Sequence, residues 1–123
     1  MATITEDYVS FKTAKLLKEK GFDEYTFSDY SEEGVIGFNE VETRIAKGYQ
    51  RPTLQMAMKW LRNTFHLEIY PFHDAIQENN DWWYRIELHS KGCSLTEYES
   101  DVIYKTYEEA CEAAIKYCLE NLI

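Results

Sequence analysis

The fold of this chain is decided by residues 106–122, TYEEACEAAIKYCLENL. Apolar residues recur in this stretch at intervals of three and four, as they do along one face of an α-helix. They are Tyr107, Ala110, Cys111, Ala114, Ile115, Cys118, Leu119 and Leu122. Thr106 and Glu109 have the spacing of a capping box, in which each side chain bonds the backbone N–H of the other residue. The stretch is therefore predicted to be a helix whose apolar face is buried in a core.

Two further helices are predicted upstream of this one. Ser10 is a good N-cap for a helix that runs to Lys20, and Gly21 suits the left-handed turn that follows a helix end. Another helix is expected over residues 53–65, with Pro52 at its start because proline lacks an N–H and fixes φ near the helical value. The apolar stripe of that helix is wide, which indicates contacts on more than one side.

Strand patterns occur in two pairs between the predicted helices. Tyr25–Tyr30 and Val35–Phe38 flank a short polar turn and are predicted to form a hairpin. Leu67–Phe72 and Trp82–His89 flank a longer polar region and are predicted to form a second hairpin. The elements then follow in the order helix, hairpin, helix, hairpin, helix.

Two stretches lack a clear period. Residues 39–51 are interpreted as a loop, and residues 91–101 are poorly patterned, although 100–104 suits a short strand. Because a hairpin alone is only marginally stable, the hairpins are expected to join beneath the helices. The sequence predicts a single α+β domain, residues 1–123, with a mainly antiparallel sheet and helices packed on one face.

The second predicted hairpin has two chemically different faces. Every second residue from Trp82 to Leu88 is apolar and is expected to face the helices. The opposite face then carries the candidate protein-binding residues, which are Tyr70, Phe72, Trp83, Arg85 and His89. Aromatic residues and arginine dominate interface hot spots, and an exposed apolar patch usually marks a contact. The predicted partner is another protein or a second copy of the chain, unless residues 39–51 or 91–101 cover this face.

The charge balance narrows the choice of partner. The chain has 123 residues, of which 13 are basic and 22 acidic, giving a net charge of −9 at pH 7. Such a charge repels a phosphate backbone, which argues against nucleic acid as a partner. Two interpretations of the acidity stay open: solubility, or an acidic inhibitor that mimics nucleic acid and occupies a basic site on another protein. The candidate residues for the mimic are Glu108, Glu109, Glu112 and Glu120.

Motifs for catalysis and cofactor binding are missing from the sequence. It has no Gly-rich phosphate loop, no G-x-S-x-G and no HExxH. Cys93, Cys111 and Cys118 form no CxxC, and the last two are interpreted as small buried hydrophobes. The prediction is therefore that no residue serves catalysis, a metal or a cofactor, and a non-enzymatic binding protein is favoured over an enzyme.

The three histidines keep one alternative open. His66 is expected at the end of a helix, where a cation suits the helix dipole. His73 and His89 lie near carboxylates or hydroxyls in the sequence, as a general base would. The alternative function is a small ligand-binding protein or enzyme with a pocket lined by one of these two histidines.

The sequence also gives an expectation about location. Residues 1–7 lack the basic start and the apolar run of a signal peptide. No stretch approaches the roughly 20 apolar residues that span a bilayer. The protein is expected to be cytoplasmic and to have no membrane partner.

Three segments carry a resemblance to a known group of proteins. They are YVSF at 8–11 through KEKGFDE at 18–24, PTLQMAMKWLR at 52–62, and YEEA at 107–110 through LENL at 119–122. Together they resemble a family of small uncharacterised proteins of gut bacteria and their phages, whereas residues 26–51 match that family poorly. The family has no established activity, so the resemblance transfers no site residue. It implies an accessory protein of a mobile element.

Overall fold

The computed structural model describes residues 6–38, 48–73, 81–89 and 95–123. Its elements are α1 (Phe11–Glu19), β1 (Ser28–Tyr30), β2 (Ile36–Phe38), β3 (Tyr49–Gln50), α2 (Leu54–Phe65), β4 (Leu67–His73), β5 (Trp82–His89), β6 (Leu95–Glu99), α3 (Tyr107–Tyr117) and a final π-helical turn (Cys118–Leu122). The mixed α+β class predicted from the sequence is confirmed.

The described strands form two small sheets instead of the single sheet that was expected. A third strand joins each hairpin, so the predicted order of helix, hairpin, helix, hairpin, helix is wrong. β3 pairs with β1 to give the order β2-β1-β3, and β6 pairs with β5 to give the order β4-β5-β6. All of these pairings are antiparallel.

The two added strands lie in the stretches where the sequence shows no clear period. Tyr49–Gln50 pairs with β1 within the predicted loop at 39–51, of which 39–47 lie outside the described residues. Leu95–Glu99 pairs with β5 along its whole length, and its polar side chains are exposed. Both strands are held by backbone pairing, so their sequences show little apolar alternation. The strand expected at 100–104 is reduced to an isolated bridge between Tyr104 and Trp82.

The helix starts follow the capping chemistry of the sequence. The side chains of Ser10, Thr53 and Thr106 each accept a hydrogen bond from the backbone N–H three residues ahead. The prediction that Pro52 is at the start of α2 is wrong, because Pro52 lies one residue before the N-cap. The N-cap residue is Thr53, whose hydroxyl caps the helix. Among the described residues, no helix combines the length and the apolar character needed to cross a membrane.

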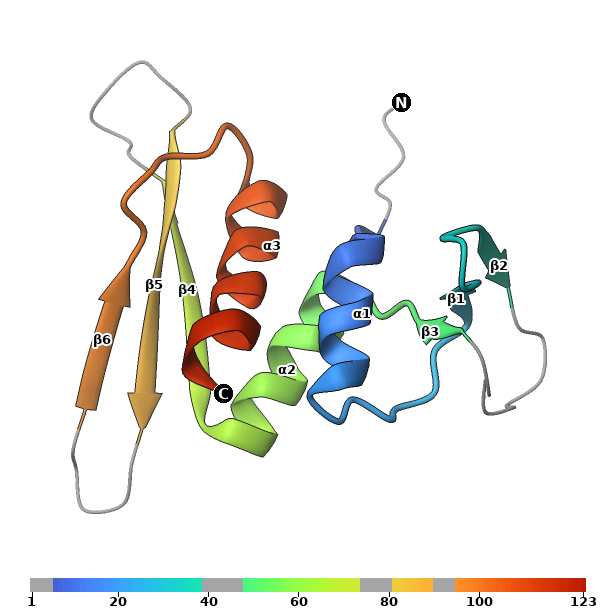
Figure 1. Cartoon of the computed structure of the whole chain (residues 1–123). Coiled ribbons are helices and arrows are strands. Elements are labelled where there is room, and N and C mark those ends of the chain that lie inside the picture. Colours follow the sequence, from blue (N-terminus) through green and yellow to red (C-terminus); the bar gives the residue numbers. More distant parts are fainter. Residues whose placement is uncertain (1–5, 39–47, 74–80, 90–94) are drawn as a thin grey trace.

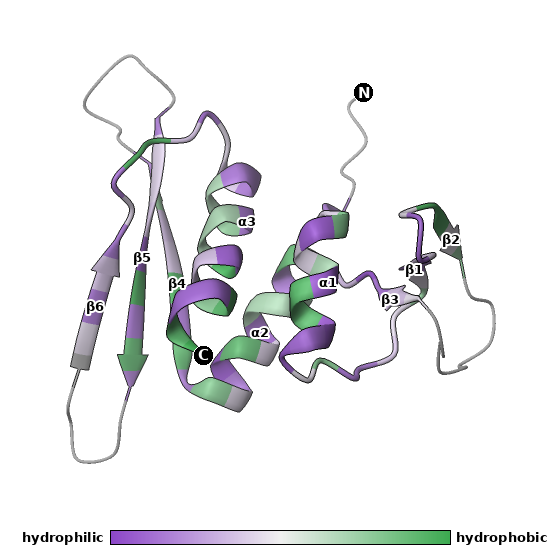
Figure 2. Cartoon of the chain, viewed as in Figure 1, coloured by the Kyte–Doolittle hydropathy of each residue, from purple (hydrophilic) through white to green (hydrophobic). Residues whose placement is uncertain are grey.

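The helices lie between the two sheets (Figure 1). α2 and α3 pack on one face of β4–β5–β6, while α1 contacts α3 and β3. The apolar sides of the helices are turned toward one another and toward the second sheet (Figure 2). The other face of the second sheet is turned away from all three helices (Figure 1).

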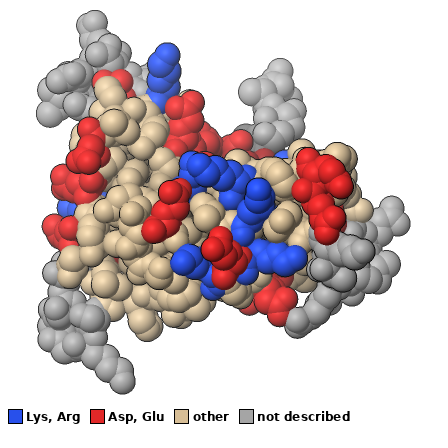
Figure 3. All heavy atoms as spheres, viewed as in Figure 1, with Lys and Arg blue, Asp and Glu red and all other residues tan. Residues whose placement is uncertain are grey.

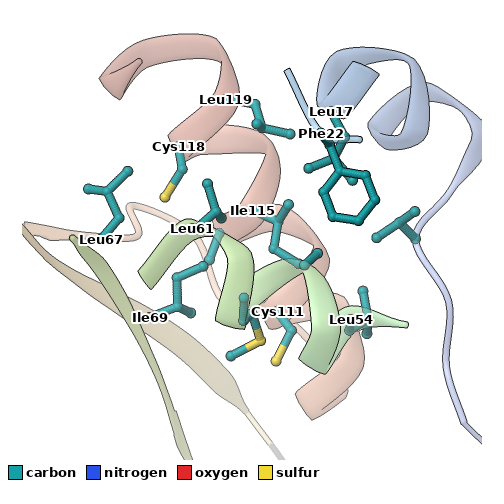
Figure 4. Packing of buried hydrophobic residues seen from close by; sticks show 14 of the residues in the cluster. Leu17, Phe22, Leu54, Leu61, Leu67, Ile69, Cys111, Ile115, Cys118 and Leu119 are labelled. Carbon is teal, nitrogen blue, oxygen red and sulfur yellow. The ribbon is translucent and has the colours of Figure 1, made fainter. Parts of the chain in front are cut away.

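One hydrophobic core joins these elements. Leu17 of α1, Leu61 of α2 and Ile115 of α3 meet there, and each is no more than 1% exposed (Figure 4). Cys111 and Cys118 are also buried in this core, as predicted. Burial raises the pKa of the Cys111 thiol to about 11 and that of Cys118 to about 12, because a thiolate is poorly solvated there. Both cysteines therefore act as neutral apolar side chains.

Candidate functional site

The candidate site is the exposed face of the second sheet, and the register of the strands builds it. Leu67 pairs with Leu88, and Ile69 pairs with Ile86. The side chains of these four residues lie on the side of the sheet that packs against the helices. Successive residues of a strand point to opposite faces, so the residues between them point away from the helices. We call Tyr70, Phe72, Trp83 and Arg85 the outer face; Tyr70 pairs with Arg85, and Phe72 pairs with Trp83.

The side chains of the outer face contact one another closely. The rings of Phe72 and Trp83 stack with their centroids 6.1 Å apart and their planes 26° from parallel. The guanidinium of Arg85 lies 5.0 Å from the centroid of the Phe72 ring and 5.5 Å from that of Tyr70. These distances are within the range of cation–π attraction. Arg85 therefore lies among aromatic rings on a sheet face, as the sequence predicted for these four residues.

The polar atoms of the outer face are partly withdrawn from water. All four of its side chains are half-buried. The Nε atom of Arg85 is buried and has no hydrogen-bond partner among the described residues. Burial raises the pKa of the Tyr70 hydroxyl, and the neighbouring carboxylate of Glu87 raises it further. Tyr70 thus stays protonated at neutral pH and can donate a hydrogen bond.

His89 is the one predicted site residue that the structure keeps apart from this group. It lies on the same face but four residues beyond Arg85 along β5, which is about 13 Å at the usual rise of a strand. Its backbone N–H donates to the carbonyl oxygen of His66 at 3.0 Å. His89 therefore joins the start of β4 to the end of β5, and the outer face is complete without it.

The three histidines lie in separate places among the described residues. His66 is the left-handed C-cap residue of α2, with φ 60°, which is a structural role. The His73 ring packs against Trp82, with 4.8 Å between the ring centroids. Three grooves among the described residues, one beside each helix, are lined by residues other than histidine. Within the described part of the chain, no three metal-binding side chains are close enough to hold an ion.

Three of the four glutamates proposed for a nucleic-acid mimic lie close together. Glu108, Glu109 and Glu112 of α3 line one groove, whereas Glu120 lies in the π-helical turn that follows α3. Glu112 is occupied by the first helix: its Oε1 accepts hydrogen bonds from the N–H of Ser10 at 3.0 Å and from the hydroxyl of Thr13 at 2.6 Å. Basic side chains lie in the middle of the face shown in Figure 3, with acidic side chains among them.

Sequence reasoning missed two surface features. A groove of about 500 Å³ between the N-terminal segment and α3 is lined by Tyr8, Leu54, Tyr104 and Glu108, among others. The first sheet and the segment that leads into it also expose large apolar side chains, with Phe27 and Phe38 each 75% exposed. The groove joins segments distant in the sequence, so no local pattern indicates it. The exposed phenylalanines have the same alternation as buried ones and could not be told apart from them.

Comparison with known proteins adds no relative to these observations. No family model, no curated protein and no solved structure matches this chain. The resemblance to small proteins of gut bacteria and phages therefore stays a prediction.

Proposed function

We propose that this protein is a non-enzymatic binding protein and that the outer face of its second sheet contacts a protein partner. The observation that carries this proposal is the stacked pair of Phe72 and Trp83, with Arg85 against it, on the face that the helices leave uncovered. In a sheet packed only against helices, the uncovered face is normally polar. Aromatic residues and arginine on such a face are the residue types that dominate binding energy in interfaces.

The backbone of the outer face favours binding without rearrangement. β4 and β5 pair continuously over seven residues, from Leu67 with Leu88 to His73 with Trp82. Their inner side is fixed by the core residues Ile69 and Ile86. A rigid platform limits the loss of side-chain freedom when a partner binds, and less binding energy is lost in ordering it.

The experiment is a capture of partners from host-cell lysate with tagged wild-type protein and a Tyr70→Ala, Trp83→Ala double variant. The control is a Phe27→Ala, Phe38→Ala double variant, which removes two exposed aromatic side chains beside and within the first sheet. Size-exclusion chromatography of the same three proteins measures self-association. We expect a specific partner that the outer-face variant loses and the control keeps.

Three outcomes would contradict the proposal. The partner could survive the outer-face variant, the control could lose it, or the wild-type protein could bind nothing and remain a monomer. Circular dichroism and a urea unfolding curve establish that the outer-face variant is folded. Because both replaced side chains point away from the core, we expect it to be.

A further inference from the structure

The outer face has acidic neighbours on the same side of the second sheet, and these identify the kind of partner that the surface suits. β4, β5 and β6 together contain four glutamates, and the register places all of them on the same side of the sheet as Trp83. Glu68 pairs with Glu87, which in turn pairs with Glu97, so three carboxylates form one row across the three strands. Glu99 pairs with Arg85 in the adjacent row. Acidic side chains are visible along the edge of the molecule formed by β6 (Figure 3).

This row of carboxylates is unfavourable for the sheet itself. Residues directly opposite each other on neighbouring strands have Cβ atoms about 4.5–5.5 Å apart, and like charges at that distance are destabilising. Among the described residues, Arg62 forms an ion pair with Glu68, at 3.2 Å, and so neutralises one carboxylate of the row. Arg85 is held against the rings of Tyr70 and Phe72. A cation brought by a partner would relieve the repulsion at Glu87 and Glu97.

We infer that the outer face binds a basic segment of a partner protein, in which an apolar anchor contacts Phe72 and Trp83 while lysine or arginine side chains reach Glu87 and Glu97. This inference rests on the proposed function and adds the chemistry of the partner. The two parts of the surface complement two different side chains of the partner. An apolar side chain packs on the rings of Phe72 and Trp83, and the charged end of a lysine or arginine pairs with Glu87 or Glu97.

A second copy of the chain does not fit this description. Two outer faces brought together would bring two rows of carboxylates into one interface. The whole chain carries a net charge of −9, which adds to the repulsion between copies. Charge complementarity therefore selects a basic partner over self-association at this face.

The strand geometry also gives a spacing for the partner. Trp83 and Glu87 are four residues apart on β5, which corresponds to about 13 Å at the usual rise of a strand. An extended partner segment that runs along β5 would place its basic residue about four positions from its apolar anchor. A helical segment would need about nine positions, since the rise is 1.5 Å per residue.

The test is selection of peptides from a random 12-residue library displayed on phage, with the intact protein as the target. We expect the selected peptides to combine an aromatic or aliphatic residue with lysine or arginine at one of these spacings. Binding of the best peptide is then measured by fluorescence anisotropy at about 0.05 M and 0.5 M salt, a range over which electrostatic attraction is strongly screened.

Two variants and a charge-matched control decide the outcome. A Glu87→Gln, Glu97→Gln variant should raise the dissociation constant of the peptide by on the order of tenfold. A Glu108→Gln, Glu120→Gln control removes the same charge from exposed positions near the ends of the last helical segment and should change it less than about twofold. The Tyr70→Ala, Trp83→Ala variant should abolish binding.

The possible failures separate this inference from the proposed function. Selected peptides that lack basic residues, or that bind the glutamine variant as tightly as wild type, overturn the basic partner. If those peptides still require Trp83, the outer face remains a binding surface. Peptides that bind the Tyr70→Ala, Trp83→Ala variant unchanged overturn both, and so does a selection that enriches no peptide.

Discussion

The two sheets of this protein are both three-stranded and antiparallel, yet different interactions stabilise them. In the second sheet the strands pair over seven and five residues, and its inner face is apolar. In the first sheet the pairings cover only three and two residues. The buried side chains in β1 and in the segment just before it include Thr26 and Ser28, beside Tyr30. A small sheet can therefore be fixed by buried polar groups where apolar area is scarce.

The polar group at the first sheet is centred on one hydroxyl. Oγ1 of Thr26 lies 2.6 Å from the carbonyl oxygen of Ser28 and 2.7 Å from Oε1 of Gln50, and it accepts the N–H of Arg51 at 3.1 Å. The guanidinium of Arg51 also donates to the hydroxyl of Ser28 at 3.1 Å. It lies 4.0 Å from the centroid of the Tyr8 ring. These contacts tie the edge strand β3 to the segment that leads into β1.

The largest difference between the sheets should appear when the same residue is truncated in each. Ile86 of β5 is fully buried and Ile36 of β2 is 48% exposed. Ile86→Ala should lower the free energy of unfolding by about 2–5 kcal/mol, because it removes buried methyl groups and leaves a cavity. Ile36→Ala should lower it by less than about 1 kcal/mol. Urea unfolding followed by tryptophan fluorescence measures both, and equal losses would show that the first sheet is as tightly packed as the second.

A smaller effect is expected when the polar group of the first sheet is broken. Thr26→Val keeps the shape of the side chain but leaves buried polar atoms of its neighbours without their partner. The expected loss is about 1–3 kcal/mol. Thr96→Val makes the same change at an exposed position of β6 and should be nearly neutral, since valine suits a strand. If the two variants unfold at the same urea concentration, hydrogen bonds around Thr26 do not hold the first sheet.

The same comparison explains which parts of the structure the sequence could predict. The second hairpin was predicted in place because apolar residues alternate from Trp82 to Leu88, and alternation fixes which face is buried. Tyr70, Phe72, Trp83 and Arg85 meet for the same reason. The helix starts at Ser10 and Thr106 were predicted correctly because capping is local chemistry.

The parts that escaped prediction depend on contacts between distant residues. Gln50 meets Thr26 across 24 positions of the chain, and Glu112 meets Ser10 across 102. Neither pair has a spacing that a local pattern could reveal. β3 and β6 were not predicted because each is an edge strand, which pairs with the backbone N–H and C=O groups of one neighbouring strand. His89 was grouped with Trp83 because alternation shows which face of the sheet a residue occupies. Alternation does not show whether two residues on that face are close enough to contact each other.

The smallest expected effect has the opposite sign and concerns the carboxylate row of the second sheet. Glu87 lies between Glu68 and Glu97, so Glu87→Gln removes two like-charge contacts while it keeps the size of the side chain. We expect a gain of a few tenths of a kcal/mol, within the range for cross-strand pairs. Glu108→Gln, on the exposed side of α3, should give no gain. The gain should shrink in high salt, because screening already weakens the repulsion. A loss of stability would mean that the contact between the Tyr70 hydroxyl and the Glu87 carboxylate stabilises the sheet more than the repulsion between the three carboxylates destabilises it. The carboxylate row would then need no cationic partner to offset that repulsion.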